Sequence, residues 1–177
     1  MTNVHLRTAT PADAETLSAL GQTTFADTFG HLYPPEDLAD FMKGHAPALY
    51  AAWATDPAYQ LLIAEQDGRA IGYALSGPCS LPHAEVTPEC GELKRIYVDK
   101  TAQGAGAGSL MLRASLDWLQ TPGRTLWIGV WSENYGAHRL YGRHGFSKAG
   151  TYEFPVGKTR DHEFVLRRRP DEIPAGA

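Results

Sequence analysis

The sequence predicts an α+β domain built on a mixed sheet, and three observations support this fold class. Its 177 residues suit one ordinary domain with a single core. Hydrophobic residues make up 43% of the chain, which is typical of globular proteins. Apolar strand patterns and helical patterns alternate in the order β-α-α-β-β-β-α-β-α-β-β, which combines a hairpin with strands joined by helices.

The first third of the chain predicts one strand followed by helices. Residues 4–7 alternate as a short strand and lead to Thr10 and Pro11, the N-cap and first residue of a helix. That helix is expected to end near Gly30. A second short helix begins after Pro34-Pro35, and residues 46–55 suit a third.

The middle of the chain contains its strongest hairpin signal. Residues 59–65 and 69–76 are apolar runs separated by Gln66-Asp67-Gly68, which predicts an antiparallel pair. A proline-containing loop at residues 78–90 leads into a strand at residues 92–98. A glycine-rich segment then precedes a helix that runs to Leu119.

The last third predicts a strand at residues 124–131, a helix at residues 134–144 that Gly145 ends, and two closing strands. These final strands cover about residues 147–154 and 162–168. We therefore expect one domain over residues 1–170 and a frayed tail over residues 171–177.

Composition and charge exclude several classes of function. The net charge of −4 and the pI near 5.9 provide no general attraction for nucleic acid or anionic lipid. No stretch approaches the ~20 apolar residues of a membrane span, and the N-terminus lacks the apolar block of a signal peptide. We expect a cytoplasmic protein.

The two cysteines, Cys79 and Cys90, suit neither a disulfide framework nor a zinc site, so both are expected to be unpaired thiols.

The segment Gln103-Gly-Ala-Gly-Ala-Gly-Ser109 is the strongest candidate for a binding site. Glycines between a strand and a helix let the backbone approach an anion, and the free N–H groups of the helix favour its charge. A dinucleotide site would need a third glycine where Ser109 stands, and a Walker loop would need a lysine after Gly108. A phosphate ligand and a ligand-free connector are the two interpretations that the glycines leave open.

Three motifs in matching order and spacing resemble the GCN5-related N-acetyltransferases (GNAT). They are Leu93-Lys-Arg-Ile-Tyr-Val98, then Gln103-x-x-Gly106-x-Gly108, then Asn134-x-x-Ala137 with Leu140-Tyr141-x-x-x-Gly145-Phe146. The resemblance covers roughly residues 4–168. Phe25-Ala-Asp-Thr-Phe29 and Trp127-Ile-Gly-Val-Trp131-Ser-Glu-Asn134 further resemble the PaiA-type spermidine/spermine N-acetyltransferases.

This resemblance implies a fold and a donor substrate. The fold is a mixed, mostly antiparallel sheet of about six or seven strands, with a splayed fourth and fifth strand and about four flanking helices. The donor is acetyl-CoA, and the backbone of the fourth strand is expected to polarise its thioester carbonyl. The cofactor-binding residues that the resemblance implies are Ile96, Tyr97, Val98, Gln103, Gly104, Ala105, Gly106, Ala107, Gly108, Ser109, Asn134, Ala137 and Arg143. For Arg143, a solvated helical arginine is the alternative.

Two residues are implied to be catalytic. Tyr141 stands where the family places the acid that protonates the departing thiolate, and a core aromatic is the alternative. An ammonium of pKa about 10.4 costs about 4.6 kcal/mol to deprotonate at pH 7, so a base must help. Glu92 has the family's carboxylate position for accepting this proton through water; a plain surface carboxylate or a salt-bridged one is the alternative. Strand alternation predicts that Glu92 shares a side with Lys94 and Ile96.

The expected reaction is transfer of acetyl to a primary amine, with spermidine or spermine as the first candidates. Acidic residues expected to attract such a cation are Asp27, Glu36, Asp37, Asp40, Glu85 and Glu89. A protein N-terminus, a lysine or another small amine is the alternative acceptor, and an acyl-CoA-sensing module without catalysis is the alternative function. The histidine spacing predicts no metal site. The resemblance also allows a homodimer.

Overall fold

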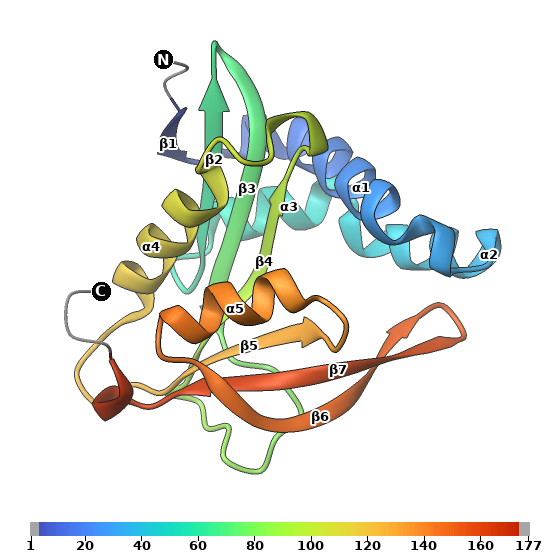
Figure 1. Ribbon diagram of the computed structural model, residues 1–177. Helices are drawn as coiled ribbons and strands as arrows, with labels where there is room; N and C mark the ends of the chain where they lie inside the picture. The colour runs from blue at the N-terminus through green and yellow to red at the C-terminus, as the bar shows by residue number, and fades with distance from the viewer. Residues whose placement is uncertain (1–3, 174–177) are drawn as a thin grey trace.

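The computed structural model describes residues 4–173 and contains one seven-stranded sheet with five α-helices (Figure 1). The strands are β1 (Val4–Thr8), β2 (Gln60–Gln66), β3 (Arg69–Pro78), β4 (Gly91–Val98), β5 (Leu126–Trp131), β6 (Ser147–Val156) and β7 (Thr159–Arg168). The helices are α1 (Ala14–Phe29), α2 (Pro35–Met42), α3 (Pro47–Thr55), α4 (Ala107–Leu119) and α5 (Tyr135–Arg143). The predicted α+β class is confirmed.

The sheet runs in the order β1-β2-β3-β4-β5-β7-β6, and only β4 and β5 are parallel neighbours. They pair at two positions, Gly91 with Leu126 and Glu92 with Trp127. Beyond these pairs β4 stays bonded only to β3 and β5 only to β7, so the two strands diverge. This opening leaves backbone groups of β4 available to a ligand.

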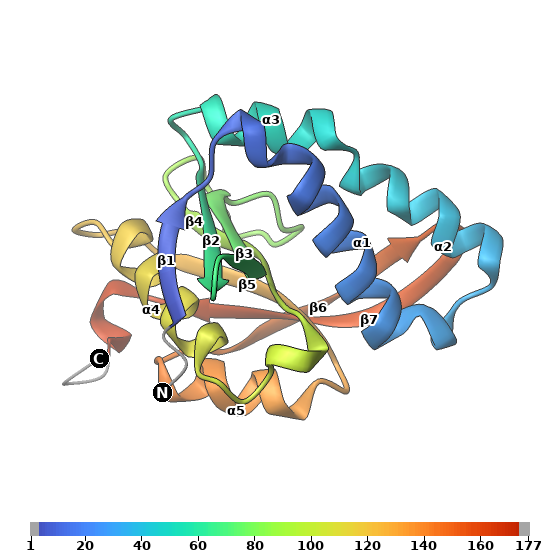
Figure 2. The same cartoon turned by 90° about the horizontal axis from the view of Figure 1, so that it is seen from above.

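Helices cover both faces of the sheet (Figure 2). One face carries α1, α2 and α3, and the other carries α4 and α5. Under α4, the buried side chains of Met111, Leu112 and Leu116 pack against strand residues such as Leu93. Under α1 and α3, the sheet contributes Ile63. Each fully buried aliphatic side chain contributes about 1.5–3 kcal/mol to stability, so both layers hold the sheet in place.

The residues at the β2–β3 turn and at the two ends of α1 explain where these elements begin and end. Asp67 and Gly68 form the β2–β3 turn with φ of 52° and 75°, the left-handed values that such a two-residue hairpin requires. α1 ends at Gly30 as expected. Its start differs, because Thr10 and Pro11 begin a 3-10 turn, Pro11–Asp13, before the α-helix. The carboxylate of Asp13 accepts the backbone N–H of Thr10 at 2.8 Å, which fixes this turn.

The C-terminal tail begins with an ordered turn. Pro170–Glu172 form a 3-10 turn in which the backbone N–H of Arg169 donates to Glu172 at 2.7 Å. The rest of the predicted frayed tail, residues 174–177, lies outside the described residues. Within residues 4–173, no helix combines the length and the apolar character that crossing a membrane demands.

A bulge in β4 corrects the predicted facing of its side chains. Ser76 pairs with Leu93 but the preceding Leu75 pairs with Arg95, so Lys94 is an extra residue in β4. Glu92 and Lys94 do share a side, where they form an ion pair at 2.8 Å. The prediction that Ile96 joins them is wrong, because the bulge shifts the alternation by one residue. Ile96 instead packs with Leu93 on the α4 side.

Candidate active site

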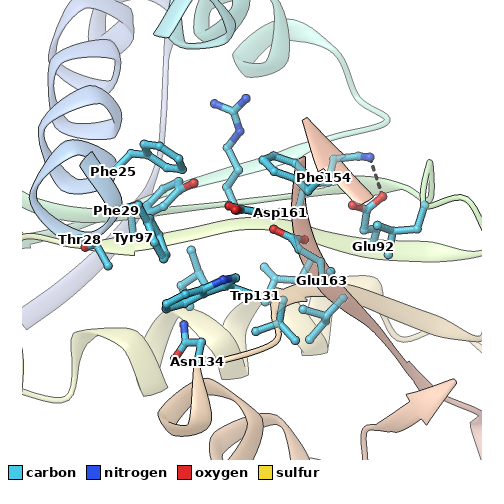
Figure 3. Close-up of a pocket in the computed structure, with 18 of the residues that line it drawn as sticks. Phe25, Thr28, Phe29, Glu92, Tyr97, Trp131, Asn134, Phe154, Asp161 and Glu163 are labelled. Carbon is cyan, nitrogen blue, oxygen red and sulfur yellow. Dashed lines mark hydrogen bonds and ion pairs between the residues drawn. The ribbon is translucent and has the colours of Figure 1, made fainter. Parts of the chain in front are cut away.

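A cavity of about 460 Å³ lies where β4 and β5 diverge (Figure 3). Its walls come from α1, β4, β5, α5, β6 and β7, together with residues 80–82 of the loop before β4. Seven of the residues predicted from the sequence line it: Glu92, Ile96, Tyr97, Val98, Gln103, Asn134 and Tyr141. The splayed strands therefore gather residues that lie more than a quarter of the chain apart.

The glycine-rich segment lies beside the cavity and begins α4. Gly104 and Gly106 have φ of 85° and 84°, and a Cβ added to either would meet nothing within 4 Å. Glycine is thus required by the backbone conformation, and open space lies beside it. Gly106 is the N-cap of α4, so the first N–H groups, from Ala107 to Ser109, have no partner within the helix. This arrangement fits a pyrophosphate.

Gln103 and Asn134 present amide groups at the two sides of the opening. Gln103 is exposed, and its Nε2 lies 3.4 Å from the carbonyl oxygen of Val98. Asn134 caps α5: its Oδ1 accepts the backbone N–H of Ala137 at 3.1 Å. The amide nitrogen of Asn134 therefore remains free to donate to a ligand, whereas the N–H of Ala137 is already used.

Tyr141 and Arg143 lie in the last turns of α5 with different surroundings. Tyr141 is 6% exposed and packs against Phe146, with ring centroids 6.3 Å apart. Burial raises the pKa of the Tyr141 phenol, so the hydroxyl stays protonated at neutral pH. Arg143 is exposed and does not line the cavity.

Glu92 is a buried carboxylate whose Oε2 is fully engaged. It accepts Lys94 Nζ at 2.8 Å, the backbone N–H of Ser80 at 2.8 Å and the Ser80 hydroxyl at 3.3 Å. Figure 3 shows the pair with Lys94 as a dashed line. These contacts attach the start of the loop at residues 79–90 to β4.

The other end of the cavity has an aromatic wall and two carboxylates. The aromatic side chains are Phe25, Phe29, Tyr33, Tyr97, Trp131, Tyr152 and Phe154. The carboxylates are Asp161, which accepts the Tyr33 hydroxyl, and Glu163, which accepts the Tyr152 hydroxyl. Neither carboxylate forms a salt bridge within the described residues. This region can attract and surround a cation.

The acidic wall therefore differs from the one that the sequence predicted. Asp37 is bound by the β6–β7 turn, Asp40 pairs with Lys43 at 2.6 Å, and Glu85 pairs with Arg167 at 2.8 Å. None of the six predicted acids is among the residues that line the cavity. The missed pair had one signal: Asp161 and Glu163 are charged residues two apart on a strand, and so share a face.

The thiols and histidines contribute no second site. Cys79 and Cys90 are free, as predicted, and burial raises the pKa of the Cys79 thiol to about 12. A thiol of that pKa is a poor nucleophile at neutral pH. Over residues 4–173, no three potential metal-ligating side chains gather at one point.

Comparisons with known proteins agree with this architecture. A model of the acetyltransferase (GNAT) family matches residues 25–146. An uncharacterized N-acetyltransferase of Lactobacillus delbrueckii subsp. lactis is 30% identical over 174 residues, which cover 95% of this chain and 98% of the relative.

Two further matches are a relative whose name contains a substrate and a solved structure with the same fold. A probable spermine N(1)-acetyltransferase of Bacillus subtilis subsp. natto is 30% identical over 92 residues, 50% of this chain and 59% of that protein. The crystal structure of a PaiA N-acetyltransferase from Thermoplasma acidophilum with coenzyme A has a TM-score of 0.74 at 15% identity, covering 94% and 99% of the two chains. That likeness shows the shared fold.

Proposed function

Because the chain belongs to the acetyltransferase (GNAT) family and uses acetyl-CoA as donor, we propose that it acetylates a primary amine of a polyamine such as spermidine or spermine. The observation that carries this proposal is the pair of carboxylates, Asp161 and Glu163, in an aromatic-walled cavity. A polyamine has a second ammonium that an ordinary monoamine lacks. Carboxylates without a cationic partner and aromatic faces are the groups that bind an ammonium. The spermine-related name of one relative agrees with this substrate class.

The donor half of the site follows from the family's chemistry and from the local geometry. We propose that the N–H groups at the start of α4, with Gln103, bind the pyrophosphate. Asn134 donates from its free amide nitrogen to the pantetheine arm or to a phosphate. The backbone of Ile96, Tyr97 and Val98, exposed where β5 diverges, stabilises the developing oxyanion of the thioester carbonyl.

The acceptor amine attacks the thioester carbon directly, without an acyl-enzyme. The new C–N bond forms as the C–S bond breaks, and the departing thiolate takes a proton from the hydroxyl of Tyr141. Tyr141 suits this role because it lines the cavity and its burial keeps the phenol protonated. A carboxylate must first take a proton from the ammonium, and the sequence favours Glu92 for this step.

The test is a steady-state assay of free-thiol release from acetyl-CoA with a panel of acceptors. The panel contains spermidine, spermine, n-butylamine, a lysine peptide and a peptide with a free N-terminus. We expect release with spermidine and spermine at a kcat/KM at least tenfold above that for n-butylamine. Equal or faster release with a peptide would show that a protein amine is the substrate, and binding without release from any acceptor would indicate a sensor.

A further inference from the structure

The carboxylate of Glu163 occupies the point where three strands meet the cavity. In the sheet register, Glu163 of β7 lies opposite Trp131 of β5 and opposite Tyr152 of β6. Figure 3 shows Glu163 directed into the same open space as Asp161 and Trp131. This position belongs to the acceptor end of the cavity.

A glycine in β5, Gly129, leaves room for the side chains of Tyr152 and Glu163 above the strand. A Cβ added to Gly129 would lie 2.6 Å from the hydroxyl oxygen of Tyr152 and 3.4 Å from Oε2 of Glu163. The hydrogen-bonded pair therefore lies directly over Gly129, one residue beyond the buried Ile128 and two beyond the last β4–β5 contact at Trp127. Glycine at this position leaves the space that the pair occupies.

The groups around Glu163 place the pKa of its carboxyl group near neutral pH, so this group can accept a proton and release it again. The hydroxyl of Tyr152 on β6 donates a hydrogen bond to the Glu163 carboxylate, and the charge of Asp161 on β7 repels its ionised form. The hydroxyl of Tyr33 donates a hydrogen bond to Asp161. Across the cavity, Glu92 of β4 is paired with Lys94, and Tyr97 of β4 is protonated at neutral pH. Burial, followed by the charge of Asp161, raises the pKa of Glu163 to about 7, against the Tyr152 hydrogen bond, which lowers it.

Glu92 has the opposite surroundings. Its Oε2 accepts three donors, one of them the ammonium of Lys94 at 2.8 Å. Lys94 and the two donors of Ser80 therefore compete with an acceptor ammonium for this oxygen. Its contacts with Ser80 give Glu92 a different task, which is to hold the loop before β4 against the sheet.

We infer that Glu163 is the general base of this enzyme, the residue that takes the proton from the acceptor ammonium before the attack. The inference rests on the proposed acetyl transfer to a primary amine. Glu163 takes one N–H proton, directly or through one water, and leaves the amine with a free electron pair. This pair forms the C–N bond. As the C–S bond breaks, the thiolate takes the proton of Tyr141. The nitrogen, which still carries one proton more than the amide product, gives that proton back to Tyr141 through water. Glu163 releases its own proton to solvent.

The experiment compares Glu163→Gln with Glu92→Gln in pH profiles of kcat and kcat/KM for spermidine. Glutamine keeps the size of the side chain and its ability to accept from Tyr152, but it cannot take a proton. We expect Glu163→Gln to lower kcat by about 10²-fold or more, to remove the acidic limb of the profile, and to leave the acetyl-CoA Kd unchanged. We expect Glu92→Gln to retain the acidic limb. Glu153→Gln, an exposed neighbour on β6, is the control for charge and should behave as the wild type.

Tyr152→Phe tests the same inference in a protein that keeps Glu163. Losing the Tyr152 hydrogen bond raises the pKa of Glu163 further, so the acidic limb should move to higher pH. An acidic limb that is unchanged in both Glu163→Gln and Tyr152→Phe, or one lost only in Glu92→Gln, would overturn the inference while acetyl transfer by the wild type stands. A wild type that releases no thiol with any amine would overturn the proposed function, and the inference with it.

Discussion

Asp37 of α2 and Thr159 of β7 are joined by two hydrogen bonds to one carboxylate oxygen. The backbone N–H of Thr159 donates to Oδ2 at 3.0 Å and its hydroxyl donates at 2.7 Å, while the N–H of Lys158 donates to Oδ1 at 2.8 Å. The contact fastens the tip of the β6–β7 hairpin beneath α2, as both ribbon views show. Tyr33 and Val156 belong to one hydrophobic cluster against which Phe154 packs, and Tyr33 and Phe154 both line the cavity, so the contact lies next to its aromatic wall.

Replacing Asp37 with alanine should therefore affect both stability and acceptor binding. Three donors lose their acceptor, so we expect the Tm to fall by several degrees and the KM for spermidine to rise. The hydrogen bonds also lower the pKa of Asp37, so its contribution is present at neutral pH and disappears as the pH falls through that lowered value. Thermal melts of Asp37→Ala and of Asp40→Ala, an exposed matched control, check this. Equal Tm values for the two variants would contradict the role of the contact.

Gly106→Ala should weaken acetyl-CoA binding. The alanine must adopt φ of 84° at the N-cap of α4, at a conformational cost of about 1–2 kcal/mol, or shift the N–H groups that follow it. We expect a rise of roughly tenfold in the acetyl-CoA Kd, measured by calorimetry. Gly123→Ala has φ of 79° and open space around it but lies outside the site, so it should lose stability with no change in Kd. A similar Kd for both variants would argue against a pyrophosphate site at Gly106.

Tyr141→Phe should lower turnover without disturbing the fold. The phenylalanine ring keeps its packing on Phe146, but no proton is available for the thiolate. We expect kcat to fall by about 10²-fold, with the acetyl-CoA Kd and the Tm near their wild-type values. Tyr135→Phe, on the same helix and 64% exposed, should leave kcat unchanged. A Tyr141→Phe enzyme within twofold of the wild-type kcat would remove the acid role.

Asp161→Asn should reduce selectivity for polyamines. The asparagine still accepts the Tyr33 hydroxyl but no longer offers a negative charge to a distant ammonium. We expect the KM for spermidine to rise by roughly tenfold, and the KM for n-butylamine to change less, because n-butylamine has no second charge. Glu36→Gln, an exposed change of α2, serves as the control. Equal effects on both amines would mean that Asp161 supports the cavity but does not recognise the substrate.

The sequence could predict the fold and the glycine-rich start of α4 because their signals are local. The Asp67-Gly68 turn, the N-cap at Asn134 and the Gly104 and Gly106 positions are each set by a few adjacent residues. A short segment that needs left-handed backbone and then begins a helix is visible without any knowledge of tertiary contacts. The structure places Asn134 in the lining of the cavity, and the glycine-rich segment follows Gln103, which also lines it.

The acidic end of the cavity could not be predicted in the same way because it depends on register and on contacts between distant segments. The extra residue at Lys94 reverses the facing of Ile96, and no local pattern marks it. Asp37 looks like any helical acid until the β6–β7 turn is placed against it. Asp161 and Glu163 enter the cavity only because β7 is inserted between β5 and β6.

A competition experiment tests the central claim most directly. The enzyme is given limiting acetyl-CoA with equal concentrations of spermidine, n-butylamine and a peptide with a free N-terminus, and the acetylated products are counted by mass spectrometry. Their ratio equals the ratio of kcat/KM values. We predict that acetylspermidine exceeds each of the other products by tenfold or more. A product mixture dominated by acetylated peptide or butylamine would contradict polyamine recognition by Asp161 and Glu163.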